Sequence, residues 1–286
     1  MTPIPPPPWD ACDDYDAIVK DKQSERRARL QSLRPTIRRI YDRYLTRAAE
    51  RRLDQQWPAT SIDDDVGRDL RHCYETPTES MKALRRRLMD LLGRHGKRRC
   101  PYCGIGQVTE LDHYLPKVDF PELSVCAYNL IPCCHDCNHL RGDHDWDLGR
   151  RPSVIHVFYE KIDTEHGHLQ ARISFDDGEF DVVFSVIVDG RRPFSARFRE
   201  HFETLNLAAR YSLQAIDELS EFISDIGGAL EADAELDGEH EVRQEASKRA
   251  DRRTAIYGAN HWKAAFYRAA AESPEVIALL HRGAAS

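Results

Sequence analysis

The stretch that decides the fold runs from Cys100 to Asp143 and reads CPYCGIGQVTELDHYLPKVDFPELSVCAYNLIPCCHDCNHLRGD. It holds two Cys-x-x-Cys pairs, Cys100/Cys103 and Cys134/Cys137. Four thiolates in two short pairs are typical of a tetrahedral Zn²⁺ site that ties two distant loops together. The sequence therefore predicts a structural zinc ion, bound by all four of these side chains.

Short elements surround this metal site. Gln107–Leu111 predicts a strand that ends at Asp112-His113, and Asn129–Pro132 predicts its partner. The segment from Cys134 to Arg141 predicts the start of a helix. Two strands and a helix around one cation form the ββα-metal arrangement, in which we expect the polar side chains of this stretch to converge.

The order Asp-His, Asn-Leu, Cys-x-x-Cys-Asn resembles the HNH nuclease family over roughly residues 97–147. Hydrolysis of a phosphodiester needs an activated water and neutralisation of the charge that develops on the phosphate. A neutral imidazole takes a proton near pH 7, so His113 is the candidate general base. Asp112 and Asn138 offer hard oxygen ligands to a catalytic Mg²⁺ or Mn²⁺.

Three further roles follow from the family resemblance. Asn129 is expected to hold the loop and orient His113 rather than bind metal. Lys117 and Arg141 are the candidate phosphate contacts.

Some ligand choices stay open. Asn138 takes the last position of the His-Asn-His triplet, and His139 is the reserve ligand there. His135 and His144 are near enough in sequence to join the metal site. Cys133 is the alternative to its neighbour among the zinc ligands.

The sequence of Leu111–Asn138 also resembles the HNH proteins of bacterial antiphage defence, notably the nuclease subunit of Septu systems and its retron-associated relatives. This resemblance implies an ABC/SMC-like ATPase partner that restrains or licenses cleavage. A stiff proline-rich arm, Met1–Trp9, and the acidic C-terminal part are then the expected docking surfaces.

Charge is divided unevenly along the chain, whose net charge is −7. Residues 1–99 hold 22 Lys/Arg and 16 Asp/Glu, and the remainder holds 19 and 32. A nucleic-acid surface is therefore expected in the N-terminal part, with the basic run Arg94–Arg99 as the main candidate. No apolar run approaches the ~20 residues of a membrane span. With no secretory leader pattern and paired thiols, the chain is expected in the cytoplasm.

The predicted fold class is α+β and mainly helical. We expect an N-terminal helical region (1–93), a central HNH module (94–151), a β-meander (152–190) and a C-terminal helical region (191–286). Periodicity predicts helices over 15–33 and 36–53, and a capping box at Thr76 opens the next helix. Runs of Val, Ile and Phe predict three meander strands, over residues 154–159, 169–175 and 181–188.

Three functions remain distinguishable. The first is a DNA endonuclease, acting alone as a nickase or as a homo-oligomer on both strands. The second is an RNase toxin with the same site, because attack by water does not require the 2′-OH. The third is a zinc-stabilised scaffold without turnover.

Overall fold

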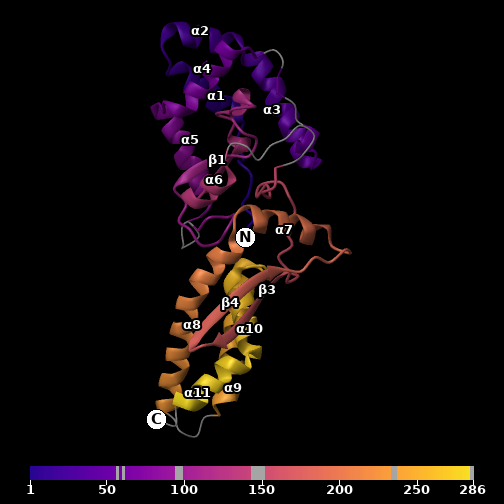
Figure 1. Cartoon of the computed structure of the whole chain (residues 1–286). Helices are drawn as coiled ribbons and strands as arrows, with labels where there is room; N and C mark the ends of the chain where they lie inside the picture. Colours follow the sequence, from indigo (N-terminus) through magenta and orange to yellow (C-terminus); the bar gives the residue numbers. More distant parts are fainter. Residues whose placement is uncertain (56–57, 60–61, 94–98, 143–151, 233–236, 284–286) are drawn as a thin grey trace. The chain divides into compact units, whose positions relative to one another are not determined.

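The computed structural model describes the chain except for residues 56–57, 60–61, 94–98, 143–151, 233–236 and 284–286 (Figure 1). The described residues are mainly helical, with two small antiparallel sheets, as the sequence predicts. They form two compact units, Thr2–Lys161 and Ile162–Ser286, and Met1 belongs with the second. In the part of the chain described, no helix has the length and apolar character needed to cross a bilayer.

The unit Thr2–Lys161 combines helices with the first sheet. Helix α5 packs on strand β2, and α6 packs on β1. Its elements are α1 Ala11–Lys20, α2 Ser24–Ser32, α3 Arg34–Ala49, η1 Leu53–Gln55, α4 Asp64–Glu75, α5 Glu79–Asp90, β1 Glu110–His113, η2 Pro121–Leu123, η3 Ala127–Asn129, β2 Leu130–Cys133 and α6 His135–Arg141.

Helix boundaries differ from the sequence prediction in two places. The helix expected over 15–33 is two helices, because the chain turns at residues 21–23 between α1 and α2. The helix expected to open at the Thr76 capping box instead begins at Glu79, so its N-cap lies two residues later than predicted. Thr78 is its N-cap, and the Thr78 hydroxyl accepts from the backbone N–H of Met81 at 3.4 Å. Both hydroxyl residues suit an N-cap, so the spacing alone does not choose between them.

The proline-rich arm is part of the folded unit rather than a free tail. The N–H of Thr2 donates to the carbonyl of Pro101 at 3.1 Å, and the N–H of Ile4 donates to the carbonyl of Val157 at 3.2 Å. Ile4 and Pro7 are buried. The arm thereby braces the first cysteine loop from outside.

The predicted three-stranded meander is a two-stranded hairpin. β3 (Leu169–Asp176) and β4 (Glu179–Val186) pair antiparallel across an Asp177-Gly178 turn in which both residues have positive φ. Residues 154–159 form turns and belong to the first unit. Val154, Ile155 and Val157 are buried there, so their apolar character reports burial and not a strand.

The unit Ile162–Ser286 packs helices on this hairpin. Helix α8 packs on β4, and α10 packs on β3 and on α9. Its helices are α7 Pro193–Thr204, α8 Leu207–Ala232, α9 Gly238–Tyr257, α10 Trp262–Glu272 and α11 Pro274–Gly283.

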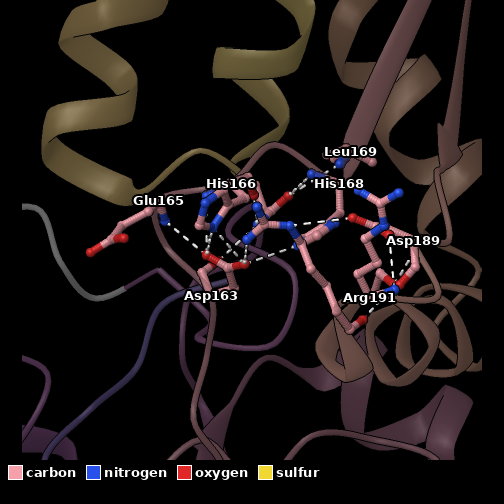
Figure 2. A network of polar contacts seen from close by, with 10 residues as sticks. Asp163, Glu165, His166, His168, Leu169, Asp189 and Arg191 are labelled. Atoms are coloured by element: carbon pink, nitrogen blue, oxygen red, sulfur yellow. Dashed lines mark hydrogen bonds and ion pairs between the residues drawn. The ribbon is translucent and has the colours of Figure 1, made fainter.

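A polar network fixes the loop before β3 (Figure 2). The Asn260 Oδ1 accepts from the N–H groups of His168 (2.6 Å) and Leu169 (3.1 Å). Its Nδ2 donates to the carbonyls of Asp163 (2.8 Å) and His166 (2.9 Å). One buried amide therefore holds four backbone groups of the loop in place.

Asp163 is the acidic centre of the network. Its carboxylate accepts from the His166 ring at 3.0 Å and the His168 ring at 3.0 Å. It also accepts from the N–H groups of Glu165 and His166. Burial alone would raise the pKa of Asp163, but these donors outweigh it and lower the pKa below its usual value.

This lowered pKa predicts a pH-dependent stability for the second unit. The unfolded carboxyl binds its proton near pH 3.9, above the folded pKa, so the stabilisation is full above about pH 4 and is lost as the pH falls further. We expect Asp163→Asn to lower the free energy of unfolding by about 1–3 kcal/mol at pH 7. Urea denaturation at pH 7 and pH 3 measures this. An equal loss at both pH values would show that the charge of Asp163 is not the cause.

Candidate functional site

The four predicted zinc ligands come together. The Sγ atoms of Cys100, Cys103, Cys134 and Cys137 all lie within 4.8 Å of one another, and all four side chains are buried. Cys103 Sγ and Cys134 Sγ are 3.8 Å apart. Tetrahedral Zn–S bonds of ~2.3 Å require S···S separations of roughly 3.8 Å, so the cluster can bind a metal such as zinc.

The backbone around the cluster is shaped for it. A Cβ added at Gly106 would lie 2.6 Å from Cys134 Cβ and 2.8 Å from its Sγ, so only glycine allows this close approach. The Ile105 N–H donates to Cys103 Sγ at 3.4 Å. Hydrogen bonding, first of all from Cys100, lowers the pKa of the Cys134 thiol, whereas burial raises the pKa of the Cys100 thiol. A bound metal requires the thiolate form of its ligands.

The other four cysteines lie outside this cluster. Cys133 is buried, and burial raises the pKa of its thiol. Cys134 therefore takes the place for which Cys133 was the alternative. Cys12, Cys73 and Cys126 are also buried, as expected for small apolar side chains.

Strand β1 and helix α6 face each other beside the cluster. β1 pairs with β2 antiparallel, with Asp112 opposite Ile131 and His113 opposite Leu130. Asn138 and Arg141, one turn apart on α6, contact Glu110 and Asp112, two residues apart on β1. Helical and strand periods thus place these four side chains on one shared face.

Asp112 is committed to protein donors. The Tyr102 hydroxyl donates to its Oδ2 at 2.8 Å, and Arg141 Nη1 donates to both of its oxygens. The same Nη1 donates to the His113 carbonyl at 2.6 Å, and Nη2 donates to the Tyr114 carbonyl. The Arg141 side chain is 1% exposed. In this structure the Arg141 guanidinium braces β1 from a buried position.

His113 is a buried, neutral imidazole. Its Nε2 lies 2.9 Å from the Ser124 carbonyl, and because a carbonyl only accepts, Nε2 carries the ring proton. The lone pair is therefore on Nδ1, to which the structure records no hydrogen bond among the residues it describes. Burial is the main cause that lowers the pKa of His113 to about 4, and the charge of Lys117 adds to it.

Tyr74 of α4 fixes the position of this imidazole from the other side. Its ring meets the His113 ring edge-on, with centroids 4.4 Å apart. Its hydroxyl donates to the Leu111 carbonyl at 2.9 Å, which ties α4 to β1. No motif near Tyr74 predicts this contact from the sequence.

Asn129 lies where a loop-holding residue is expected. Its Oδ1 accepts from the Leu115 N–H at 2.8 Å and from the Tyr44 hydroxyl at 3.2 Å. Its Nδ2 donates to the Leu115 carbonyl at 3.0 Å, and its own carbonyl accepts from the Tyr114 N–H at 2.9 Å. Asn129 is fully buried, so it secures the chain directly after His113.

Removal of this amide should be costly. Asn129→Ala leaves the buried N–H and C=O of Leu115 without partners, and we expect it to lower the free energy of unfolding by about 2–4 kcal/mol. The thermal unfolding transition of the Thr2–Lys161 unit measures this loss of stability. Gln31→Ala, which removes an exposed amide from α2 of the same unit, is the control. Equal stability of Asn129→Ala and wild type would contradict the role.

Asn138 is half-buried on α6, and its Nδ2 donates to Glu110 Oε2 at 2.6 Å. The structure records no partner for its Oδ1 within the described residues. Glu110, which the sequence analysis did not select, also accepts from His135 Nδ1 at 2.8 Å. An amide oxygen next to carboxylates is a donor set that fits Mg²⁺ or Mn²⁺.

The remaining predicted residues have distinct positions. His139 is exposed and stacks on His135, with ring centroids 6.0 Å apart. Lys117 is half-buried in the loop that follows β1. His144 and all but the last residue of the basic run Arg94–Arg99 lie outside the described residues.

Comparison with known proteins gives two partial similarities. The chain is 33% identical to protein ea31 of Escherichia phage lambda over 138 residues, which cover 47% of this chain and 46% of that protein. It is 31% identical to Septu protein PtuB of Bacillus thuringiensis over 77 residues, 25% of this chain and 28% of that protein. The chain thus spans less than half the length of these curated relatives. No protein-family model matches it, and no solved structure does.

Proposed function

We propose that this chain is an HNH endonuclease that hydrolyses phosphodiester bonds in DNA, with His113 as its general base. The observation that carries the proposal is the state of His113: a neutral ring whose Nε2 is held by Ser124, which leaves the Nδ1 lone pair for a proton. The similarity to Septu protein PtuB supports a role in antiphage defence.

In this proposal each side chain near His113 has a separate task. His113 Nδ1 takes the proton of the attacking water, and the Ser124 carbonyl stabilises the imidazolium that forms. Asn129 keeps the loop after the base in place through Leu115. Lys117 contacts the phosphate. The charge of Lys117 also contributes to the lowered pKa of His113, which is in keeping with a position near the base. Arg141 is assigned to bracing β1, and the earlier assignment to phosphate is not kept.

Two metals belong to the proposal. The four-cysteine site would hold zinc, which would tie the loop of Cys100 and Cys103 to the start of α6. Asn138 Oδ1 and Asp112 would hold Mg²⁺ or Mn²⁺, which neutralises charge on the phosphate when bound. Each carboxylate oxygen has two lone pairs, and Asp112 Oδ1 accepts from Arg141 alone among the recorded donors, so Oδ1 retains one lone pair for a cation.

A zinc-stabilised scaffold without turnover is the second candidate. The observation that favours it is the ion pair of Asp112 with Arg141, which already neutralises the carboxylate. Buried pairs of this kind are commonly structural. The two candidates therefore differ in whether the face formed by β1 and α6 binds a divalent cation at all.

Incubation of the purified chain with supercoiled plasmid and with total RNA, each with Mg²⁺, Mn²⁺ or EDTA, separates the candidates. We expect cation-dependent nicking or linearisation of the plasmid. Degradation of RNA alone would replace DNA by RNA as the substrate. Intact plasmid and intact RNA under all conditions would favour the scaffold.

The proposed partner is an ABC/SMC-like ATPase, and the similarity to Septu protein PtuB is its support. The acidic residues of the second unit are the proposed docking surface, because the proline-rich arm packs on its own unit. Co-purification of such an ATPase with the full chain from its host tests this. Recovery of the tagged chain without any ATPase would contradict it.

A further inference from the structure

Glu110 joins β1 to α6 at the edge of the proposed cation site. Its Oε2 accepts from Asn138 Nδ2 at 2.6 Å, and its Oε1 accepts from His135 Nδ1 at 2.8 Å. The Glu110 side chain is 32% exposed, so these bonds are partly shielded from water. His135 and Asn138 are three residues apart on α6 and present their side chains to the same strand.

The bond to Asn138 determines which end of its amide faces outward. An amide has an NH₂ end and an oxygen end, and only the oxygen can coordinate a cation. A carboxylate accepts hydrogen bonds and cannot donate them, so Glu110 is compatible with the NH₂ end alone. The amide therefore directs Oδ1 away from Glu110.

The four-cysteine site next to Asn138 supports this orientation of its amide. Cys137, its neighbour, belongs to the four-cysteine site, which ties the start of α6 to the loop that carries Cys100 and Cys103. With the backbone fixed, rotation about the two side-chain torsions of Asn138 is the remaining freedom. Glu110 removes it through one charge-assisted hydrogen bond.

We propose that Glu110 is a positioning residue that presents Asn138 Oδ1 to the divalent cation, without itself touching the substrate. The inference rests on the proposed function, and it adds the residue that orients the cation ligand. Partners that orient a ligand in this way typically affect metal affinity 10–100-fold.

Glu110→Gln tests the proposal, because the new side chain can meet either end of the Asn138 amide. We expect the dissociation constant for Mn²⁺ of the zinc-loaded full chain, followed by electron paramagnetic resonance of the free ion, to rise about tenfold or more. The Mn²⁺ concentration for half-maximal plasmid cleavage should rise in parallel, and the rate at saturating Mn²⁺ should return close to that of wild type.

Asp136→Asn is the matched control. Asp136 is an exposed carboxylate on the same helix, so its substitution removes the same charge near the site and retains Glu110 as the acceptor of the Asn138 amide. We expect a much smaller change in Mn²⁺ affinity. An equal loss in both variants would show a general charge effect and overturn the positioning role.

The same substitution made in an Asn138→Asp variant provides a second test. In Asn138→Asp the side chain has an oxygen at both ends, so orientation no longer matters. Glu110→Gln should then cause no further loss of Mn²⁺ affinity. A tenfold loss in this background would contradict the proposal.

The failures are distinguishable. A wild-type chain that neither binds Mn²⁺ nor cuts would overturn the proposed function. A wild-type chain that binds Mn²⁺ and cuts, with an unchanged dissociation constant in Glu110→Gln, would overturn only the role of Glu110.

Discussion

Cys137→Ser should unfold the unit Thr2–Lys161. A structural zinc site contributes on the order of 10–16 kcal/mol, and a whole domain is stable by only about 5–15 kcal/mol, so the unit should not survive the loss. Cys137 is fully buried, and a serine there is a poor zinc ligand in an apolar site. We expect no bound zinc and no cooperative unfolding transition for this unit. Zinc content by mass spectrometry and thermal unfolding provide the measurements.

Cys133→Ala is the matched control for this experiment. Cys133 is as buried as the ligands and adjacent to one of them, but it lies outside the cluster. We expect it to keep one zinc per chain and to lose about 1–2 kcal/mol of stability. One zinc per chain and an unchanged unfolding midpoint in Cys137→Ser would contradict the zinc assignment.

The parts of the site that the sequence predicted correctly depend on local patterns. In a chain with reduced thiols, two Cys-x-x-Cys pairs are typical of a metal site, and the four sulfurs do cluster. The strands lie close to the predicted segments Gln107–Leu111 and Asn129–Pro132, with β1 shifted to Glu110–His113 and β2 to Leu130–Cys133, and α6 follows the second pair. Such features are set within a few residues of chain.

The features that the sequence did not predict depend on contacts between distant segments. Arg141 and Asp112 are 29 residues apart, and a lone arginine near a phosphodiesterase motif does not reveal that it will be buried. Nothing in the sequence around Glu110 predicts its role, which follows from its contact with Asn138 of α6. Residues 154–159 have strand composition, but they lie in turns and irregular chain, where Val154, Ile155 and Val157 are buried; an apolar run alone does not distinguish a strand from other buried chain.

The most direct test of the central claim compares wild type with His113→Ala on supercoiled plasmid with Mn²⁺. Loss of the Nδ1 lone pair removes the general base, so we expect cleavage to slow by roughly 10²–10⁴-fold. Zinc content should be unchanged, because His113 is not among the sulfur ligands. His240→Ala, which removes an exposed imidazole of α9, should cut like wild type and controls for the substitution itself, while residual cleavage by His113→Ala reports any contaminating nuclease. Equal cleavage by zinc-loaded wild type and His113→Ala would contradict the account.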